Sequence, residues 1–251
     1  MLIRNEYEWE KSESGTHTAL FVNYIPPVIE KGYLSFSGQK APYVFFMGQG
    51  EMDINNITAY ILGGEVWVSE ATLIAIGGKI KLSSSIGPAI VYAIGSDVEI
   101  EFCASGGTVF YPPEEENIQG NIRMAKMKKI KAVQSFSVLQ VVKNQKEWDE
   151  IPPNTLTVIV IKGDEKIKIN KQKAPHIVQV SGETIVSAGV TLVAVGGSVE
   201  CRGGTVIGCE SPGDEYPPLY VKIKSGKLYQ YGGTLETFNF NNWKDIYIQK
   251  I

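Results

Sequence analysis

Two hydrophobic patterns recur along the chain, and both indicate β-strands. At 98–102 and 166–169, aliphatic and charged residues alternate with a period of two. At 138–142 and 156–161, short β-branched and aliphatic runs suit strands that are buried on both faces. No amphipathic segment of ten residues supports a helix. The patterns predict an all-β fold made of many short strands.

Glycine pairs separate these segments. Each of six pairs is followed by any residue and then by an aliphatic one. The pairs begin at Gly63, Gly77, Gly106, Gly196, Gly203 and Gly232. A glycine pair before an alternating segment predicts a tight hairpin turn, because such turns need a positive φ that glycine adopts without strain. Proline pairs at 26–27, 112–113, 152–153 and 217–218 are expected to end strands.

The spacing of these residues indicates a tandem duplication. The separation between Gly77 and Gly106 equals that between Gly203 and Gly232, which gives an offset of 126 between the copies. The segments 25–27 and 151–153, both Ile-Pro-Pro, share this offset, whereas Lys-Ala-Pro at 40–42 recurs at 173–175 with an offset of 133. We therefore expect two copies, residues 1–125 and 126–251, in which Gly63, Gly77 and Gly106 occupy the same turns as Gly196, Gly203 and Gly232.

Many short strands in about 125 residues predict two tandem β-sandwich domains of jelly-roll type. The alternative is a β-solenoid, to which glycine turns are also suited. A solenoid should keep one short period over many coils, and glycine-pair spacings of 14, 29 and 7 do not sustain one.

Charge is small overall but unevenly distributed. The 251 residues carry a net charge of −3, which gives no general case for nucleic-acid binding. Residues 1–125 contain 7 Lys/Arg and 15 Asp/Glu, and residues 126–251 contain 17 and 12. An acidic and a basic copy could attract each other or steer neighbouring molecules head to tail, or the contrast could reflect drift after duplication. The lysine-rich stretch 123–131 is expected to be an exposed linker, with a basic patch as the alternative.

The sequence predicts neither export nor membrane insertion. The first residues lack a basic segment followed by an apolar one, so no signal peptide is expected. No apolar run approaches the roughly 18 residues of a membrane helix. The expected location is a virion or the cytoplasm.

Catalytic, cofactor-binding and metal-binding residues are not expected. His17 and His176 are the two histidines, and the cysteines lack the spacing of a zinc site. Cys201 and Cys209 are expected to be buried thiols, with a disulfide between them as the alternative. The acidic segment 114–116 is expected to be a solvated loop.

The carboxy-terminal aromatic residues are the candidate interface. They are Phe238, Phe240, Trp243 and Tyr247. Asparagines lie among them, so the stretch could bind sugars, although Phe238 and Phe240 share a strand face as core residues do.

These features favour a non-enzymatic structural or assembly protein, such as a virion coat, tail or adaptor component. Its expected partners are copies of itself and other structural proteins. The alternative is a carbohydrate-binding or receptor-binding module, and a glycosidase-type enzyme is the third possibility.

Overall fold

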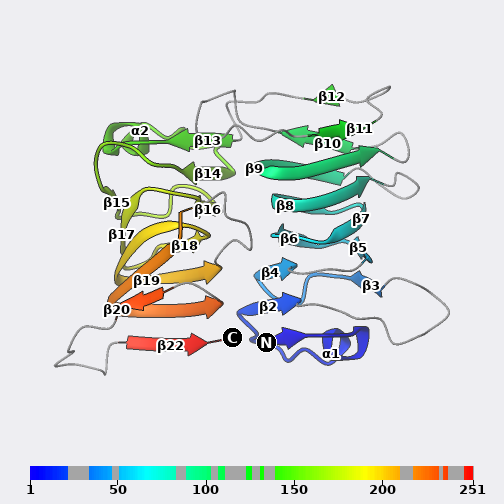
Figure 1. Ribbon diagram of the computed structural model, residues 1–251. Coiled ribbons are helices and arrows are strands. Elements are labelled where there is room, and N and C mark those ends of the chain that lie inside the picture. The colour runs from blue at the N-terminus through cyan, green and yellow to red at the C-terminus, as the bar shows by residue number, and fades with distance from the viewer. Residues whose placement is uncertain are drawn as a thin grey trace. The chain divides into compact units, whose positions relative to one another are not determined.

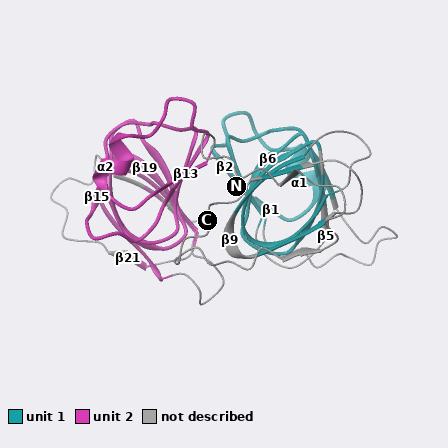
Figure 2. Ribbon diagram, turned by 90° about the horizontal axis from the view of Figure 1, so that it is seen from above, with its two compact units in different colours: residues 1–135 teal, residues 136–251 magenta. Residues whose placement is uncertain are grey.

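The computed structural model describes residues 1–21, 34–46, 51–82, 89–102, 107–110, 123–125, 131–132, 139–209, 217–231, 234–236 and 246–250. The chain divides into two compact units, residues 1–135 and 136–251 (Figure 2). In each unit, strands stack in successive coils (Figure 1). Every strand pair in these ranges whose register is known is parallel, from β1–β2 to β19–β20. The fold is therefore a β-solenoid, and the prediction of jelly-roll sandwiches is wrong because those need antiparallel strands.

The strands of unit 1 form two rows, and most coils contribute one strand to each row. Row A contains β1 (Leu2–Ile3), β2 (Thr18–Phe21), β4 (Tyr43–Phe46), β6 (Thr58–Ile61), the first parts of β8 (Thr72–Leu82) and β9 (Ala89–Phe102), β10 (Gly107–Phe110) and β12 (Lys131–Ala132). Row B contains β3 (Leu34–Ser37), β5 (Glu51–Asn55), β7 (Glu65–Ser69), the second parts of β8 and β9, and β11 (Arg123–Ala125). Because β8 and β9 pass through the corner without a break, they join both rows into one sheet.

Unit 2 has the same two rows. Row A contains β13 (Leu139–Val142), β14 (Thr157–Val160), β16 (His176–Gln179), β18 (Thr191–Ala194), the second parts of β19 (Gly197–Cys209) and β20 (Leu219–Tyr231), and β22 (Ile246–Lys250). Row B contains β15 (Ile167–Ile169), β17 (Glu183–Ser187), the first parts of β19 and β20, and β21 (Thr234–Glu236). A short helix follows the first strand of each unit: α1 (Glu6–Glu10) and α2 (Gln145–Asp149).

The variable coil length explains why the sequence did not reveal the solenoid. Thr58 lies opposite Thr72, and Thr191 opposite Thr205, so these two central coils have the same length. The coil from Val206 to Leu228 is longer, because its connection at the corner is longer. The glycine-pair spacing of 14 is one central coil, and the spacing of 7 is half of one. Only the insertions hide the period.

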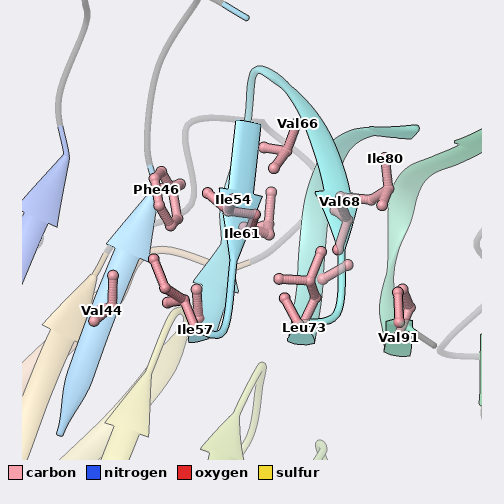
Figure 3. Packing of buried hydrophobic residues seen from close by; sticks show 14 of the residues in the cluster. Val44, Phe46, Ile54, Ile57, Ile61, Val66, Val68, Leu73, Ile80 and Val91 are labelled. Carbon is pink, nitrogen blue, oxygen red and sulfur yellow. The ribbon is translucent and has the colours of Figure 1, made fainter. Parts of the chain in front are cut away.

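Aliphatic ladders between the two rows form the core of each unit. One ladder of unit 1 consists of Ala19, Val44, Ala59, Leu73, Val91 and Val109, all buried and in register. Figure 3 shows row A residues such as Val44 and Leu73 in the same cluster as row B residues such as Ile54 and Val68. Burial of these ladders is the main stabilising contribution that the sequence supplies.

The two hydrophobic patterns of the sequence correspond to the two rows. All four residues of the row A strand β14 are buried. In the row B strand β15, Ile167 and Ile169 are buried and Lys168 between them is exposed. Row A strands such as β14 therefore give continuous apolar runs in the sequence, and row B strands such as β15 give alternating ones, although the row A part of β20, residues 227–231, also alternates.

The internal correspondence between the units differs in part from the prediction. Gly64 and Gly197 both follow a row A strand and have φ of 84° and 82°. Gly77, however, lies where β8 passes from row A to row B, whereas Gly203 lies where β19 passes from row B to row A. The predicted equivalence of Gly77 and Gly203 is therefore wrong. Gly106 and Gly232 lie outside the described residues.

The division between the units lies after residue 135, later than the predicted boundary at 125/126. Strand β12 pairs with β10, and β11 pairs with β9, so parts of the lysine-rich stretch belong to the last coils of unit 1 rather than to a linker. With the division after residue 135, unit 1 has 11 Lys/Arg and 15 Asp/Glu, and unit 2 has 13 and 12. The net charges are then −4 and +1, a much weaker contrast than the predicted acidic and basic copies.

Substitution of Gly197 by alanine should cost far more stability than substitution of Gly189. Both glycines have positive φ, which costs an alanine about 1 kcal/mol. A Cβ on Gly197 would also lie 2.5 Å from the carbonyl oxygen of Gly182, whereas a Cβ on Gly189 would meet nothing within 4 Å. In denaturant unfolding, Gly197→Ala should lose at least about 2 kcal/mol more than Gly189→Ala. Equal losses would contradict this account of the corner.

Candidate interaction surfaces

The first coil of each unit is closed by its short helix. In unit 2, Asn144 Oδ1 accepts a hydrogen bond from Glu147 N at 2.9 Å, and Glu147 Oε2 accepts one from Lys143 N at 2.6 Å. The same two bonds occur in unit 1 between Glu8 N and Asn5 Oδ1, and between Arg4 N and Glu8 Oε2. Each helix start is therefore capped by its own side chains.

A buried tryptophan and a lysine complete this closure. Trp9 of α1 and Trp148 of α2 are 1% and 0% exposed. Lys173 Nζ donates to the carbonyl oxygens of Trp148 at 2.9 Å and Asp149 at 2.8 Å. Lys40 Nζ makes the matching bonds to Trp9 at 3.2 Å and Glu10 at 3.1 Å. The lysine of each Lys-Ala-Pro segment thus satisfies carbonyl groups at the carboxyl end of the helix.

The outward side of row B carries charged side chains that pair between neighbouring strands. These pairs are Glu65–Lys81, Lys79–Glu101 at 3.2 Å, Lys166–Glu183 at 3.0 Å and Glu200–Lys224 at 2.8 Å. Parallel stacking brings residues of successive coils within reach, so opposite charges form ladders along the unit. These charges stabilise the stack of coils.

Glu200 pairs with two cationic side chains. Its Oε1 atom is 2.8 Å from both Arg202 Nε and Lys224 Nζ, and its side chain is 12% exposed. The hydrogen bond from Arg202, followed by that from Lys224, lowers the pKa of Glu200 to about 2. Glu200 therefore remains ionised through the ordinary pH range.

The histidines lie in different units. His17 Nδ1 is 2.9 Å from Thr18 Oγ1, and His176 begins β16, where burial lowers its pKa. Among the residues that the structure describes, no three His, Cys, Asp or Glu side chains are grouped so that they could hold a metal ion. The acidic segment 114–116 lies outside those residues.

Cys201 and Cys209 are free thiols, so the alternative of a disulfide between them is wrong. Cys201 Sγ lies 3.2 Å from the carbonyl oxygen of Ser225. Burial raises the pKa of Cys201 to about 11 and that of Cys209 to about 12. Both are therefore poor nucleophiles.

The structure describes little of the predicted interface. Phe238, Phe240 and Trp243 lie outside the described residues. Tyr247 lies in β22, opposite Lys227 of β20. Strand β22 pairs with β20 along one edge, and no described strand pairs with its other edge. This strand is the part of the predicted interface for which the structure provides geometry.

Sequence reasoning missed the capped ends. The segments 5–9 and 144–148 both have the form Asn-x-x-Glu-Trp, with an offset of 139. The segments 39–42 and 172–175 both read Gln-Lys-Ala-Pro. In each segment, the glutamine Oε1 atom accepts a hydrogen bond from a backbone N–H group. The donor is the first residue of the row A strand one coil further on, Thr58 of β6 or Thr191 of β18. The Lys-Ala-Pro repeat is already visible at the offset of 133, whereas the Asn-x-x-Glu-Trp repeat needs a third offset, 139.

Comparison of the chain with protein-family models, curated proteins and solved structures found no match. None of the helices within the described ranges is long and apolar enough to cross a membrane.

Replacement of Lys173 by methionine should destabilise unit 2 by about 1–2 kcal/mol, because two carbonyl groups lose a charged donor while the apolar stem remains. Lys171→Met is the matched control, since Lys171 is an exposed lysine shortly before it in the chain. Its unfolding free energy should stay within about 0.5 kcal/mol of wild type in denaturant titrations. A control that lost as much as Lys173→Met would contradict the assigned role.

The contribution of Glu200 to stability should depend on pH. Its pKa in the folded protein, about 2, lies below the ordinary value of 4.5, so its stabilising contribution is present above pH 4.5 and is lost as the pH falls toward 2. Glu200→Gln should cost about 1–2 kcal/mol at neutral pH, and this cost should shrink in acid.

Glu183→Gln is the control for this measurement, because Glu183 is 57% exposed in its pair with Lys166. It should cost less than about 0.5 kcal/mol at either pH. Denaturant titrations at several pH values measure both costs. A Glu200→Gln cost that did not change with pH would refute the assignment.

Proposed function

We propose that the chain is a non-enzymatic structural protein that assembles with copies of itself, as coat, tail or adaptor components of a virion do. The observation that supports this most directly is the repetitive architecture. Both units consist of in-register parallel coils, and unit 2 ends in a strand paired along one edge within the described residues. Stacked coils contact only their neighbours and can be extended by further strands.

The arrangement of charge also supports a structural role. The row B pairs, such as Lys79–Glu101 and Lys166–Glu183, join neighbouring strands of the stack. These carboxylates already pair with lysine side chains of the neighbouring strands, as expected of a surface that stabilises a structural protein. A hydrolase would instead direct two carboxylates at one substrate position.

Charge supplies only a small part of the proposed assembly energy. The units carry −4 and +1, and exposed ion pairs are worth about 0–1 kcal/mol each. Apolar and aromatic surface must supply most of the affinity. We assign this role to the carboxy-terminal stretch with Phe238, Phe240, Trp243 and Tyr247, which extends into β22.

Sedimentation velocity over a wide concentration range tests the proposal. Wild type should self-associate, and its association should slow as salt rises, because exposed charges steer the encounter. Trp243→Ala should weaken association at least about tenfold, as loss of a buried aromatic anchor does. Trp67→Ala is the control, since Trp67 lies in row B of unit 1 with Lys81 Nζ 4.6 Å from its ring centroid.

A protein that stays monomeric at high concentration in low salt would overturn the proposal. The carbohydrate-binding or receptor-binding module would then be favoured, and glycan binding by the monomer would support it. Self-association that Trp243→Ala leaves unchanged would remove Trp243 from the contact.

A further inference from the structure

The outward face of row B in unit 2 carries more positive than negative charge. Its strands β15, β17, β19 and β20 are successive neighbours in the sheet (Figure 1). Side chains alternate along each strand, so Ile167 and Ile169 face the core while Lys168 is exposed. Cations stay in excess when Glu236 of β21, which lies in register with Lys222, is counted. We call this surface the basic face, and its described charged side chains are Lys166, Lys168, Arg202, Lys222 and Lys224, against Glu183 and Glu200.

The corresponding face of unit 1 has the opposite sign. Its described charged side chains are Asp53, Glu65, Glu99 and Glu101, against Lys79 and Lys81. Both faces belong to the same kind of parallel row, so the fold itself does not require positive charge there. The excess of cations is therefore specific to unit 2 and is not explained by the stacking of its coils.

Ion pairs within the basic face do not neutralise it. Glu200 lies 2.8 Å from both Arg202 Nε and Lys224 Nζ, so these three side chains together keep one positive charge. Opposite Lys168 on the neighbouring strand is the uncharged Ile185. An anion from outside the unit is therefore attracted to this face.

An exposed tyrosine and two hydroxyl groups lie beside these cations. Tyr220 is 45% exposed, and its neighbours in register are Ser198 of β19 and Thr234 of β21. The side chains of Arg202 and Lys224, on β19 and β20, are 51% and 49% exposed. An aromatic ring packs against the apolar face of a sugar ring, and side-chain hydroxyls form hydrogen bonds with those of the sugar. The basic face thus combines positive charge with groups suited to a sugar.

We propose that the basic face of unit 2 binds an anionic polysaccharide, whose sulfate or carboxylate groups meet the cations while a sugar ring lies against Tyr220. A nucleic acid fits less well. Single strands are bound by a series of aromatic rings on which successive bases stack, whereas the described part of this face offers Tyr220 alone. Duplexes are bound by strongly basic surfaces, and unit 2 has a net charge of only +1. This inference goes beyond the proposed function, because it does not require the chain to self-associate.

Binding to immobilised dextran sulfate tests the proposal, with unsulfated dextran as the neutral polymer of the same backbone. Dilute wild-type protein should bind the sulfated polymer and not the neutral one. The logarithm of its association constant should fall linearly with the logarithm of the salt concentration, because cations of the protein displace counterions from the polymer. Duplex and single-stranded DNA at the same salt concentration give the comparison with nucleic acid.

Two substitutions change the charge of the basic face in opposite directions. Lys168→Gln removes an exposed cation and should raise the dissociation constant about two- to fivefold, as loss of one exposed charge contact does. Glu183→Gln removes a carboxylate that is 57% exposed in its pair with Lys166, and should lower the dissociation constant by a similar factor. A variant that gains affinity is folded, so the test does not rest on loss of binding alone.

Matched substitutions in unit 1 are the controls. Lys11→Gln removes an exposed cation, and Glu99→Gln removes a carboxylate from the corresponding face of row B. They change the net charge of the chain by the same amounts as the two test substitutions. Both controls should bind dextran sulfate as wild type does.

Each outcome decides the proposal. Equal binding to sulfated and neutral dextran, or no binding to either, overturns it. Effects of Lys11→Gln and Glu99→Gln as large as those of the test substitutions also overturn it, because net charge rather than this face would then determine affinity. DNA that binds more tightly than dextran sulfate overturns the choice of a polysaccharide. A wild type that stays monomeric yet binds dextran sulfate through Lys168 contradicts self-assembly and supports this inference.

Discussion

The in-register stacking of aliphatic side chains between the two rows is the constraint on which both units depend. Leu73 lies between Ala59 and Val91 on neighbouring strands, and each must face inward for the ladder to continue. A single-residue insertion within a strand would turn every later side chain to the other face. Length can therefore vary only at corners. The longer coil that ends at Leu228 gains its extra residues there, while the ladder stays in register.

Equivalent positions in the two units can hold side chains of different polarity. Phe46 of unit 1 stacks on Phe21 with ring centroids 4.4 Å apart. Its counterpart in unit 2 is Gln179, which is also fully buried. Gln179 Nε2 donates to the carbonyl oxygens of Gly182 at 3.1 Å and Gly196 at 3.2 Å, so this polar side chain is satisfied by the corners. A side chain must fill this buried position, and its hydrogen bonds offset the cost of burying a polar one.

Local pattern was enough to predict strands but not their pairing. The runs at 156–161 and 166–169 correspond to β14 and β15. A strand buried on both faces gives a continuous apolar run, and a strand buried on one face gives an alternating pattern. Parallel pairing gives no such local pattern in the sequence, since the paired strands are separated along the chain by a corner. Glycine pairs were ambiguous because both kinds of corner use them, which is why Gly77 and Gly203 were wrongly equated. The interface residues Phe238, Phe240 and Trp243 remain predictions, and neither the register of Ile248 with Leu228 nor its half-buried state has a signal in the sequence.

The ends of a solenoid require a separate solution, because a coil at either end has a neighbour on one side only. The contact between Lys40 and Trp9 spans 31 residues and that between Lys173 and Trp148 spans 25, yet both form the same hydrogen bonds. The arrangement therefore depends on the two short motifs that form it, Asn-x-x-Glu-Trp and Gln-Lys-Ala-Pro, and not on the number of residues between them. The last strand of unit 2 faces the same physical requirement with a half-buried Ile248 and an unpaired edge among the described residues. Ile248 continues the ladder of Leu192, Val206 and Leu228 through the same parallel pairing that joins the other coils, so β22 differs from the interior strands only in having a described neighbour on one side.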